Sequence, residues 1–237
     1  MVRAYSPSQV ILVAYKSIDD PGTGQIISID LGSGTNLGHS FKELSTSFQI
    51  ALIHGTGLDI THLMGLNEKT MAIHVYSLGK EIPVARFFGH DRPCSIDVSP
   101  DGRWCVGGNE KGTIYLWDFT TGELVLMDAD AHYQRIGQVK FSMDGSHFVS
   151  SSGDGMVKLW SLSSWYSLIY SLFLTFLDSL VRTKVHGPVF TANIHSAAVT
   201  GIHLGFGVGK NFRILSGSLD KKCHVLLIPF LLISVGW

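Results

Sequence analysis

Apolar and polar residues alternate in short stretches along the chain, and turn residues separate the stretches. Apolar side chains recur at every second position in 94–98 and again in 139–141, and each stretch is followed by an Asp-Gly turn. A second stretch and a Gly-containing turn lead to a third, which ends in Trp117 or Trp160. Period-two alternation bounded by turn residues predicts half-buried antiparallel strands, and Asp-Gly supplies the positive φ that tight turns need. The pattern therefore predicts an all-β protein.

The same pattern occurs twice at a fixed offset. Residues 89–124 match residues 131–162, with the histidines 42 positions apart and the tryptophans 43 apart. This resembles the WD40 repeat, which has a period of about 40–45 residues, Gly-His near its start and Trp-Asp near its end. A Gly-His pair ending at His90 and a Trp-Asp pair beginning at Trp117 reproduce both signatures. The resemblance implies a β-propeller, in which each repeat forms a four-stranded blade.

Weaker copies flank these two repeats, so we expect a single WD40 propeller domain over residues 1–237. About five blades are recognisable, out of a ring that would commonly hold about seven. The last blade runs into an apolar tail at 225–237 that is aberrant for a blade, which suggests a C-terminally truncated chain. The expected blades lie at about 8–40, 46–82, 86–126, 130–162 and 194–230, with an apolar insert at 163–193.

Blades of WD40 proteins are typically tied by a buried chain of four side chains, and the resemblance implies such residues here. A loop His, a strand Ser, a turn Asp and a strand Trp satisfy one another's buried donors and acceptors. In the third blade Lys111 stands where the Asp should be, and the fifth blade lacks the Trp. The expected blade residues are His90, Trp117 and Asp118 in the third blade; His132, Ser150 or Ser152, Asp154 and Trp160 in the fourth; and His195, Ser216 or Ser218, and Asp220 in the fifth.

The composition argues against several classes of function. The 237 residues carry 18 Lys and Arg against 19 Asp and Glu, a net charge of −1, and only 16% are charged. This balance argues against a basic nucleic-acid coat and against an acidic tail. The three cysteines fit no zinc knuckle, redox pair or disulfide framework, and His54, His62 and His74 show no ligand spacing. We therefore expect no metal, no cofactor and no direct nucleic-acid binding.

Two other features weakly favour different classes of protein. Residues 28–35 look like the first motif of S-adenosylmethionine-dependent methyltransferases, in which a strand runs into a Gly-rich loop. A β repeat follows instead of a βαβ series, so a structural turn is favoured. Uncharged stretches at 159–177 and 225–237 are too short or too serine-rich for a membrane span to be expected. The chain contains no hydrolase elbow, zinc-protease or phosphate-loop motif, and we expect it not to be an enzyme.

A finer resemblance concerns the segments 131–162 and 194–220. Both look like blades of the rixosome WD-repeat subunits, the family called Ipi3 in fungi and WD repeat-containing protein 18 in animals. The resemblance implies a nuclear scaffold, nucleolar and nucleoplasmic, with a cytoplasmic pool left open. It implies a role in pre-rRNA processing and 60S biogenesis, with links to chromatin and DNA replication. The implied partners are rixosome subunits and pre-60S particles, with no small-molecule substrate. A generic WD40 adaptor, such as a ubiquitin-ligase substrate receptor or signalling scaffold, is the alternative, and a methyltransferase a remote one.

Overall fold

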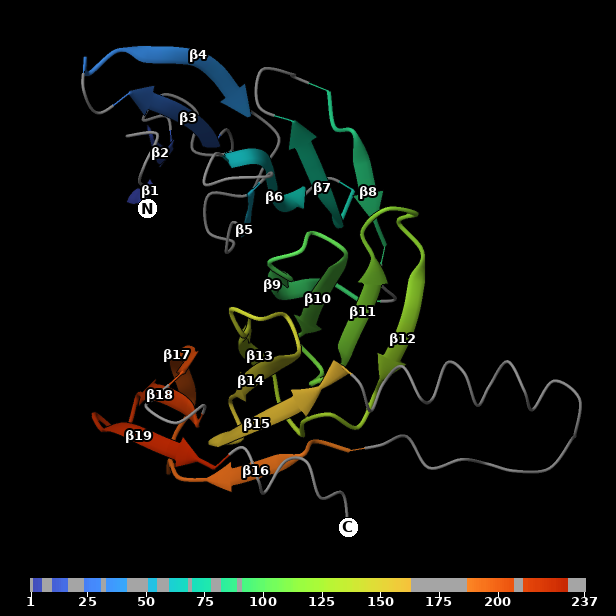
Figure 1. The fold of residues 1–237 in the computed structure, drawn as a ribbon, viewed down its shortest axis with the longest axis vertical. Coiled ribbons are helices and arrows are strands. Elements are labelled where there is room, and N and C mark those ends of the chain that lie inside the picture. Colours follow the sequence, from blue (N-terminus) through green and yellow to red (C-terminus); the bar gives the residue numbers. More distant parts are fainter. Residues whose placement is uncertain are drawn as a thin grey trace, which may run out of the picture. The chain divides into compact units, whose positions relative to one another are not determined.

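The structure is a computed structural model that describes residues 2–5, 10–16, 24–30, 33–41, 51–54, 60–67, 70–77, 82–88, 91–162, 187–206 and 211–229. The elements given for these residues are nineteen β-strands (Figure 1). The strands are β1 (Val2–Tyr5), β2 (Val10–Lys16), β3 (Gly24–Asp30), β4 (Asn36–Phe41), β5 (Ala51–His54), β6 (Ile60–Asn67), β7 (Ala72–Ser77), β8 (Ala85–Phe87), β9 (Pro93–Val98), β10 (Trp104–Asn109), β11 (Ile114–Asp118), β12 (Leu124–Asp128), β13 (Ile136–Phe141), β14 (His147–Ser152), β15 (Met156–Ser161), β16 (Phe190–Asn193), β17 (Val199–Phe206), β18 (Phe212–Ser218) and β19 (Cys223–Ile228).

The strands form five antiparallel sheets, in each of which consecutive strands are neighbours. The chain divides into two compact units, one of residues 1–93 and 119–123 and the other of residues 94–118 and 124–237. The first unit contains the sheets β1–β4 and β5–β8. The second unit contains β9–β12, β13–β16 and β17–β19, which we call sheet I, sheet II and sheet III.

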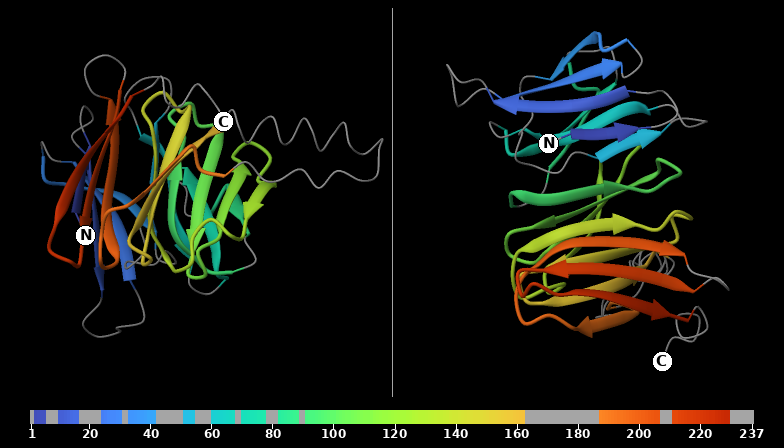
Figure 2. Two further views of the ribbon diagram at one scale, coloured as in Figure 1. Left: turned by 90° about the horizontal axis from the view of Figure 1, so that it is seen from below. Right: turned by 90° about the vertical axis from the view of Figure 1, so that its left-hand side faces the viewer.

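The three sheets of the second unit pack face to face in chain order (Figure 2). Sheet II has a neighbouring sheet on each side, and all six residues of β14, one of its two inner strands, are buried for that reason. The apolar cluster between sheets I and II includes Val106, Leu116, Val139, Phe148 and Trp160. The cluster between sheets II and III includes Val149, Leu159, Ile202, Phe212 and Ile214.

The two Asp-Gly turns lie where the sequence predicts them. Gly102 and Gly145 both have φ of 69°, a left-handed conformation that glycine adopts without a steric cost. In the second turn the Ser142 hydroxyl donates to Asp144 Oδ1 at 2.6 Å, and the Gly145 amide donates to the Ser142 carbonyl at 3.0 Å. These local bonds fix the hairpin that joins β13 to β14.

The prediction of an all-β fold is confirmed for the described residues. Sheet II differs in one respect from the expected layout, because residues 190–193 form its fourth strand although the sequence placed them in the insert. Strand β16 pairs with β15 through Leu159 and Phe190, so the chain returns to the same sheet after residue 162. Residues 163–186 lie outside the described part. Among the described residues, no helix has the length and apolar character that crossing a bilayer requires.

Candidate functional site

The expected blade residues of sheet II lie together in one chain of hydrogen bonds. His132 precedes β13, and its Nδ1 lies 2.9 Å from Asp154 Oδ2 in the β14–β15 turn. Its Nε2 lies 2.7 Å from the Ser150 hydroxyl on β14. Trp160 on β15 donates from Nε1 to the same hydroxyl at 2.8 Å. The four side chains therefore connect a loop, a turn and two strands of one sheet.

Sheet III repeats this arrangement without the tryptophan. His195 Nδ1 lies 3.0 Å from Asp220 Oδ2, and its Nε2 lies 2.9 Å from the Ser216 hydroxyl. The position that corresponds to Trp160, six residues after the aspartate, is occupied by Leu226, which packs against the cluster between sheets II and III. The ring of His224 instead lies edge-on against His195, with centroids 4.8 Å apart.

The structure distinguishes between the two serines that the sequence left open in each sheet. Ser150 and Ser216 contact the histidines. Ser152 donates to the Gln134 carbonyl and accepts from the Asp154 amide, so it holds the turn. Ser218 makes the equivalent bonds, to the Ala197 carbonyl and from the amide of the turn aspartate.

Burial sets the protonation state of the sheet II network. The pKa of His132 is lowered, chiefly by burial, although the nearby Asp154 carboxylate acts in the opposite direction. In the neutral imidazole one nitrogen donates and the other accepts. The carboxylate can only accept, so Nδ1–H donates to Asp154 and Nε2 accepts from the Ser150 hydroxyl. The Ser150 oxygen in turn accepts from Trp160, and every polar group of the network is satisfied.

The turn aspartates are held in the ionised form. Burial opposes ionisation of Asp154, but the Met156 amide and the His132 side chain more than offset it, so the pKa is lowered. In sheet III burial likewise opposes ionisation, while the Lys222 amide and His195 lower the pKa of Asp220 to about 2. Both carboxylates are therefore available as acceptors at neutral pH.

The order of groups in these networks is that of a Ser-His-Asp triad, with the carboxylate at Nδ1 and the hydroxyl at Nε2. A catalytic serine must be accessible to a substrate. Ser150 is 0% exposed, and the indole of Trp160 donates to the oxygen that would have to attack. Ser216 is also buried, at 3%. The arrangement can therefore satisfy buried polar groups, but neither hydroxyl is accessible to a substrate.

Sheet I closes its β10–β11 turn with a residue that the sequence analysis did not select. Asn109 Oδ1 accepts from the amides of Lys111 and Thr113, at 2.9 and 2.8 Å, and its Nδ2 donates to the Tyr115 hydroxyl at 3.0 Å. An asparagine whose side-chain oxygen accepts from the amide two residues later forms an Asx turn, so Asn109 fills the role that was expected of an aspartate at position 111.

The remaining expected blade residues of sheet I are placed as follows. Trp117 is buried on β11 and stacks on Tyr115, with ring centroids 5.4 Å apart. Asp118 ends β11, is half-buried and pairs with Trp104 of β10. His90 lies outside the described residues.

One histidine of the first unit is a satisfied core residue. His74 is 2% exposed, and its Nε2 lies 3.1 Å from the Thr70 hydroxyl while its Nδ1 faces Asn67 and Tyr76, each at 3.4 Å. His62 lies on β6 and is half-buried. The side chain of His54 lies outside the described part of the structure.

A second set of polar residues joins neighbouring sheets and was not predicted. Asp97 on β9 accepts from the Phe141 amide at 2.8 Å and from Lys140 Nζ at 3.0 Å. Ser95 accepts from the Val139 amide at 3.0 Å, and Gln138 of sheet II accepts from the Ile202 amide of sheet III at 3.0 Å. Side chains on the first strand of one sheet (β9 or β13) thus satisfy backbone groups on the first strand of the next sheet (β13 or β17). No sequence signal marks them, because the partners are 43 or more residues apart.

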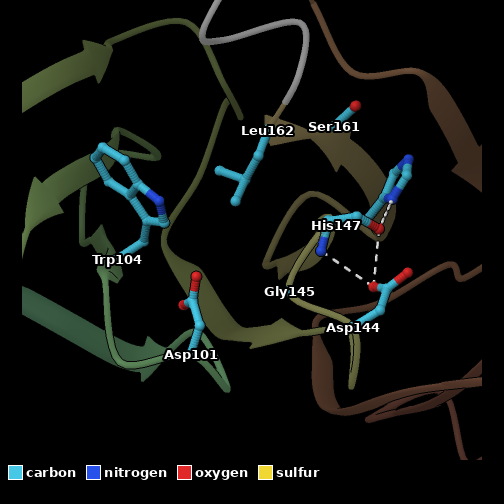
Figure 3. A pocket seen from close by; sticks show the side chains of 8 residues that line it. Asp101, Trp104, Asp144, Gly145, His147, Ser161 and Leu162 are labelled. Carbon is cyan, nitrogen blue, oxygen red and sulfur yellow. Dashed lines mark hydrogen bonds between the residues drawn. The ribbon is translucent and has the colours of Figure 1, made fainter.

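A hollow of about 280 Å³ lies between the β9–β10 turn and the β13–β14 turn (Figure 3). Asp101 and Trp104 line one side of it, and Asp144, Gly145 and Leu162 line the other. One oxygen of Asp101 is bound by the Ser99 hydroxyl, and one of Asp144 by Ser142 and Ser146. The carboxylates therefore already serve the turns. The Ser146 hydroxyl lies 2.6 Å from His147 Nδ1 and donates its proton to Asp144 Oδ1 at 2.8 Å, so it too belongs to the turn.

The described residues contain no group of three or more His, Cys, Asp or Glu side chains that could hold a metal ion. Burial raises the pKa of the Cys105 thiol well above its usual range, and Asp97 adds to this effect. A thiol in this environment stays protonated and unreactive.

Comparison with known proteins defines the class to which these sheets belong. The WD40 family, described as "WD domain, G-beta repeat", matches residues 81–118 and 125–161. These matches cover sheet I and most of sheet II, the sheets that contain Trp117 and Trp160. The chain therefore contains two segments that match the WD40 repeat.

Several curated proteins resemble the chain over longer stretches. WD repeat-containing protein 18 of Rattus norvegicus is 33% identical over 142 residues, which is 59% of this chain and 30% of that protein. The pre-rRNA-processing protein crb3/ipi3 of Schizosaccharomyces pombe is 31% identical over 172 residues, 73% of this chain and 37% of that protein. Protein ROOT INITIATION DEFECTIVE 3 of Arabidopsis thaliana is 29% identical over 217 residues, 92% of this chain and 46% of that protein. The matches thus span less than half the length of these relatives.

Proposed function

We propose that this chain is a non-catalytic WD40 scaffold that acts in the nucleus, in pre-rRNA processing and maturation of the large ribosomal subunit. The observation that carries the proposal is its similarity to a protein named for pre-rRNA processing over 73% of the chain. Similarity to WD repeat-containing protein 18 over 59% of the chain supports the same assignment. The partners proposed are the other rixosome subunits and pre-60S particles.

The geometry of the histidine networks supports a scaffold over an enzyme. Ser150 and Ser216 are both buried. In sheet II the side chains that form the network with His132, namely Asp154, Ser150 and Trp160, are all hydrogen-bonded. Stacked antiparallel sheets offer their loops and outer strands as rigid contact surfaces, which suits assembly of a complex.

Depletion of the chain in the cells that produce it tests the proposed function. We expect pre-rRNA species that retain internal transcribed spacer 2 to accumulate on a northern blot, and the wild-type chain to restore processing. The tagged chain should also recover rixosome subunits and pre-60S particles from nuclear extract. Unchanged precursor levels together with no recovered particles would instead favour a generic WD40 adaptor.

Two serine variants test the absence of catalysis. Ser150→Ala and Ser216→Ala remove the hydroxyls of the triad-like networks and leave the rest of the chain intact. We expect each variant to restore processing whenever it accumulates to the wild-type level. Failure to restore processing at normal protein levels would mean that a hydroxyl takes part in chemistry.

A further inference from the structure

The outermost strand of the β5–β8 sheet, β8, is flanked at both ends by exposed apolar residues. Burial alternates along residues 82–88, and Phe87 is 0% exposed on the inner side. On the outer side Ile82 is 75% exposed, Val84 49% and Phe88 61%. An exposed strand of a soluble protein normally carries polar residues on its outer side. Strand β16, the outermost strand of sheet II, follows that rule with the exposed Thr191 and Asn193.

The strand is also an edge in the part of the chain that the structure describes. β8 pairs with β7 through Ile73–Phe87 and Val75–Ala85, and β7 is its one neighbour in the described sheet. The Val84 amide donates to the Val75 carbonyl at 2.7 Å, which extends the pairing before the strand proper. An edge with alternating apolar side chains is the arrangement to which a further extended segment can add.

A single charge stands in the middle of this apolar row. Arg86 lies on the outer side, between Val84 and Phe88, and is exposed. Its side chain takes part in no salt bridge or hydrogen bond within the described residues. Cross-strand pairs of opposite charge stabilise antiparallel strands, whereas like charges opposite each other destabilise them. The row therefore favours a segment with an acidic residue opposite Arg86 and apolar residues two positions to either side.

We propose that β8 and its outer row, Ile82, Val84, Arg86 and Phe88, form a docking edge for an extended segment of a partner protein with this apolar–acidic–apolar pattern. The segment lies along the edge as an added antiparallel strand. Its apolar side chains cover the outer row, and its carboxylate pairs with Arg86. The proposal rests on the scaffold role proposed above, because a scaffold needs a surface that contacts a partner protein.

Peptide binding to the full chain tests the docking edge. The probe is a fluorescein-labelled peptide in which threonine alternates with valine, glutamate and isoleucine in that order; a second peptide carries lysine in place of glutamate. We expect fluorescence anisotropy to show binding of the glutamate peptide with a Kd of about 0.1 mM. Arg86→Glu should weaken that binding about tenfold and strengthen binding of the lysine peptide by a similar factor.

Arg135→Glu is the matched control, because Arg135 is also an exposed arginine but lies in the second unit. It should leave both affinities unchanged, and circular dichroism should show that both variants are folded. Val84→Thr, which keeps the β-branched shape and the native Arg86, should weaken binding of both peptides by about threefold relative to the wild-type chain. No binding of the glutamate peptide at about 1 mM, or equal binding by Arg86→Glu, would overturn the proposal. Either result would leave the rRNA-processing test unaffected, because the peptide assay contains no ribosomal precursor.

Discussion

Sheets II and III hold the same three side chains in the same order, but only sheet II completes the network with a tryptophan. His132 and His195 make contacts of nearly equal length with Asp154 and Asp220, at 2.9 and 3.0 Å. Trp160 is 0% exposed and bonded to Ser150, whereas the corresponding Leu226 in sheet III is half-buried and has no polar group. The loop-to-turn contact therefore forms whether or not the strand supplies an indole.

The difference separates two functions within one network. The histidine and the aspartate join the loop before each sheet to a turn of the same sheet. Trp160 adds a bond to β14 and a large apolar surface, stacked on Phe148 with centroids 5.9 Å apart. The His–Asp contact thus holds the loop to the turn, and Trp160 fills the space between sheets II and I. Changes to the two parts should thus have effects of different size.

Loss of the indole should have the largest effect. Trp160→Leu gives sheet II the residue of sheet III, leaves a cavity beside Phe148 and removes a donor to Ser150. We expect the free energy of unfolding to fall by about 2–4 kcal/mol, measured by chemical denaturation. Trp160→Phe, which keeps a ring but no donor, should cost about half as much. A loss below about 0.5 kcal/mol for the leucine variant would show that the two sheets are equivalent at this position.

Loss of the turn carboxylate should have the next largest effect. Asp154 accepts from His132, from the Tyr133 amide at 3.2 Å and from the Met156 amide at 2.9 Å. Asp154→Ala strands these donors, and we expect a destabilisation of about 1–3 kcal/mol. The measurement is the melting temperature, with the exposed Asp130→Ala as the control. An unchanged melting temperature for Asp154→Ala would contradict the network in sheet II.

Acidification should weaken sheet II through its histidine. Burial lowers the pKa of His132, so an unfolded chain takes up a proton near pH 6.5 while the folded chain does so only at lower pH. The unfolded state therefore binds more protons in this range, and stability falls as the pH drops below about 6.5. His132→Gln should flatten the slope of unfolding free energy between about pH 7 and pH 5. A slope equal to that of the wild type would mean that His132 titrates alike in both states.

The smallest effect is expected at the turn of sheet III. Lys221 has a φ of 65°, a left-handed conformation that costs a residue with a Cβ atom free energy. Sheet II has Gly155 after its aspartate, with a φ of 79°. Lys221→Gly should remove this strain, but the glycine also gives the unfolded chain more conformational freedom, which offsets part of the gain. We expect the free energy of unfolding to rise by about 0.5 kcal/mol. A destabilisation in the same denaturation experiment would show that the lysine side chain makes a compensating contact.

Local features of the fold were predictable because they depend on neighbouring residues. The Asp-Gly turns and the period-two strands follow from backbone conformation and burial, which a short stretch of sequence determines. The choice between Ser150 and Ser152 was not predictable, because residues two apart on a strand share a face. The position of the His132 ring along that strand decides between them, because it meets Ser150 while Ser152 meets the Gln134 carbonyl.

Features that join distant segments could not be predicted. Asp97 meets the Phe141 amide only because β9 of sheet I lies close to β13 of sheet II. Asn109, the last residue of β10, binds the amides of the β10–β11 turn, whereas the repeat pattern predicted that the turn residue at position 111 would do so. The outward apolar row of β8 was also missed, because its strand lies at a boundary between expected repeats.

The central claim is that His132, Ser150, Asp154 and Trp160 act as one structural unit. A double-mutant cycle with Asp154→Ala and Trp160→Phe tests it, because these two side chains are joined only through His132 and Ser150. We expect the two losses of unfolding free energy to be non-additive, with a coupling energy of about 0.5 kcal/mol or more. The pair Asp220→Ala and Leu226→Phe in sheet III should be additive. Additive losses in sheet II, within about 0.3 kcal/mol, would contradict the claim.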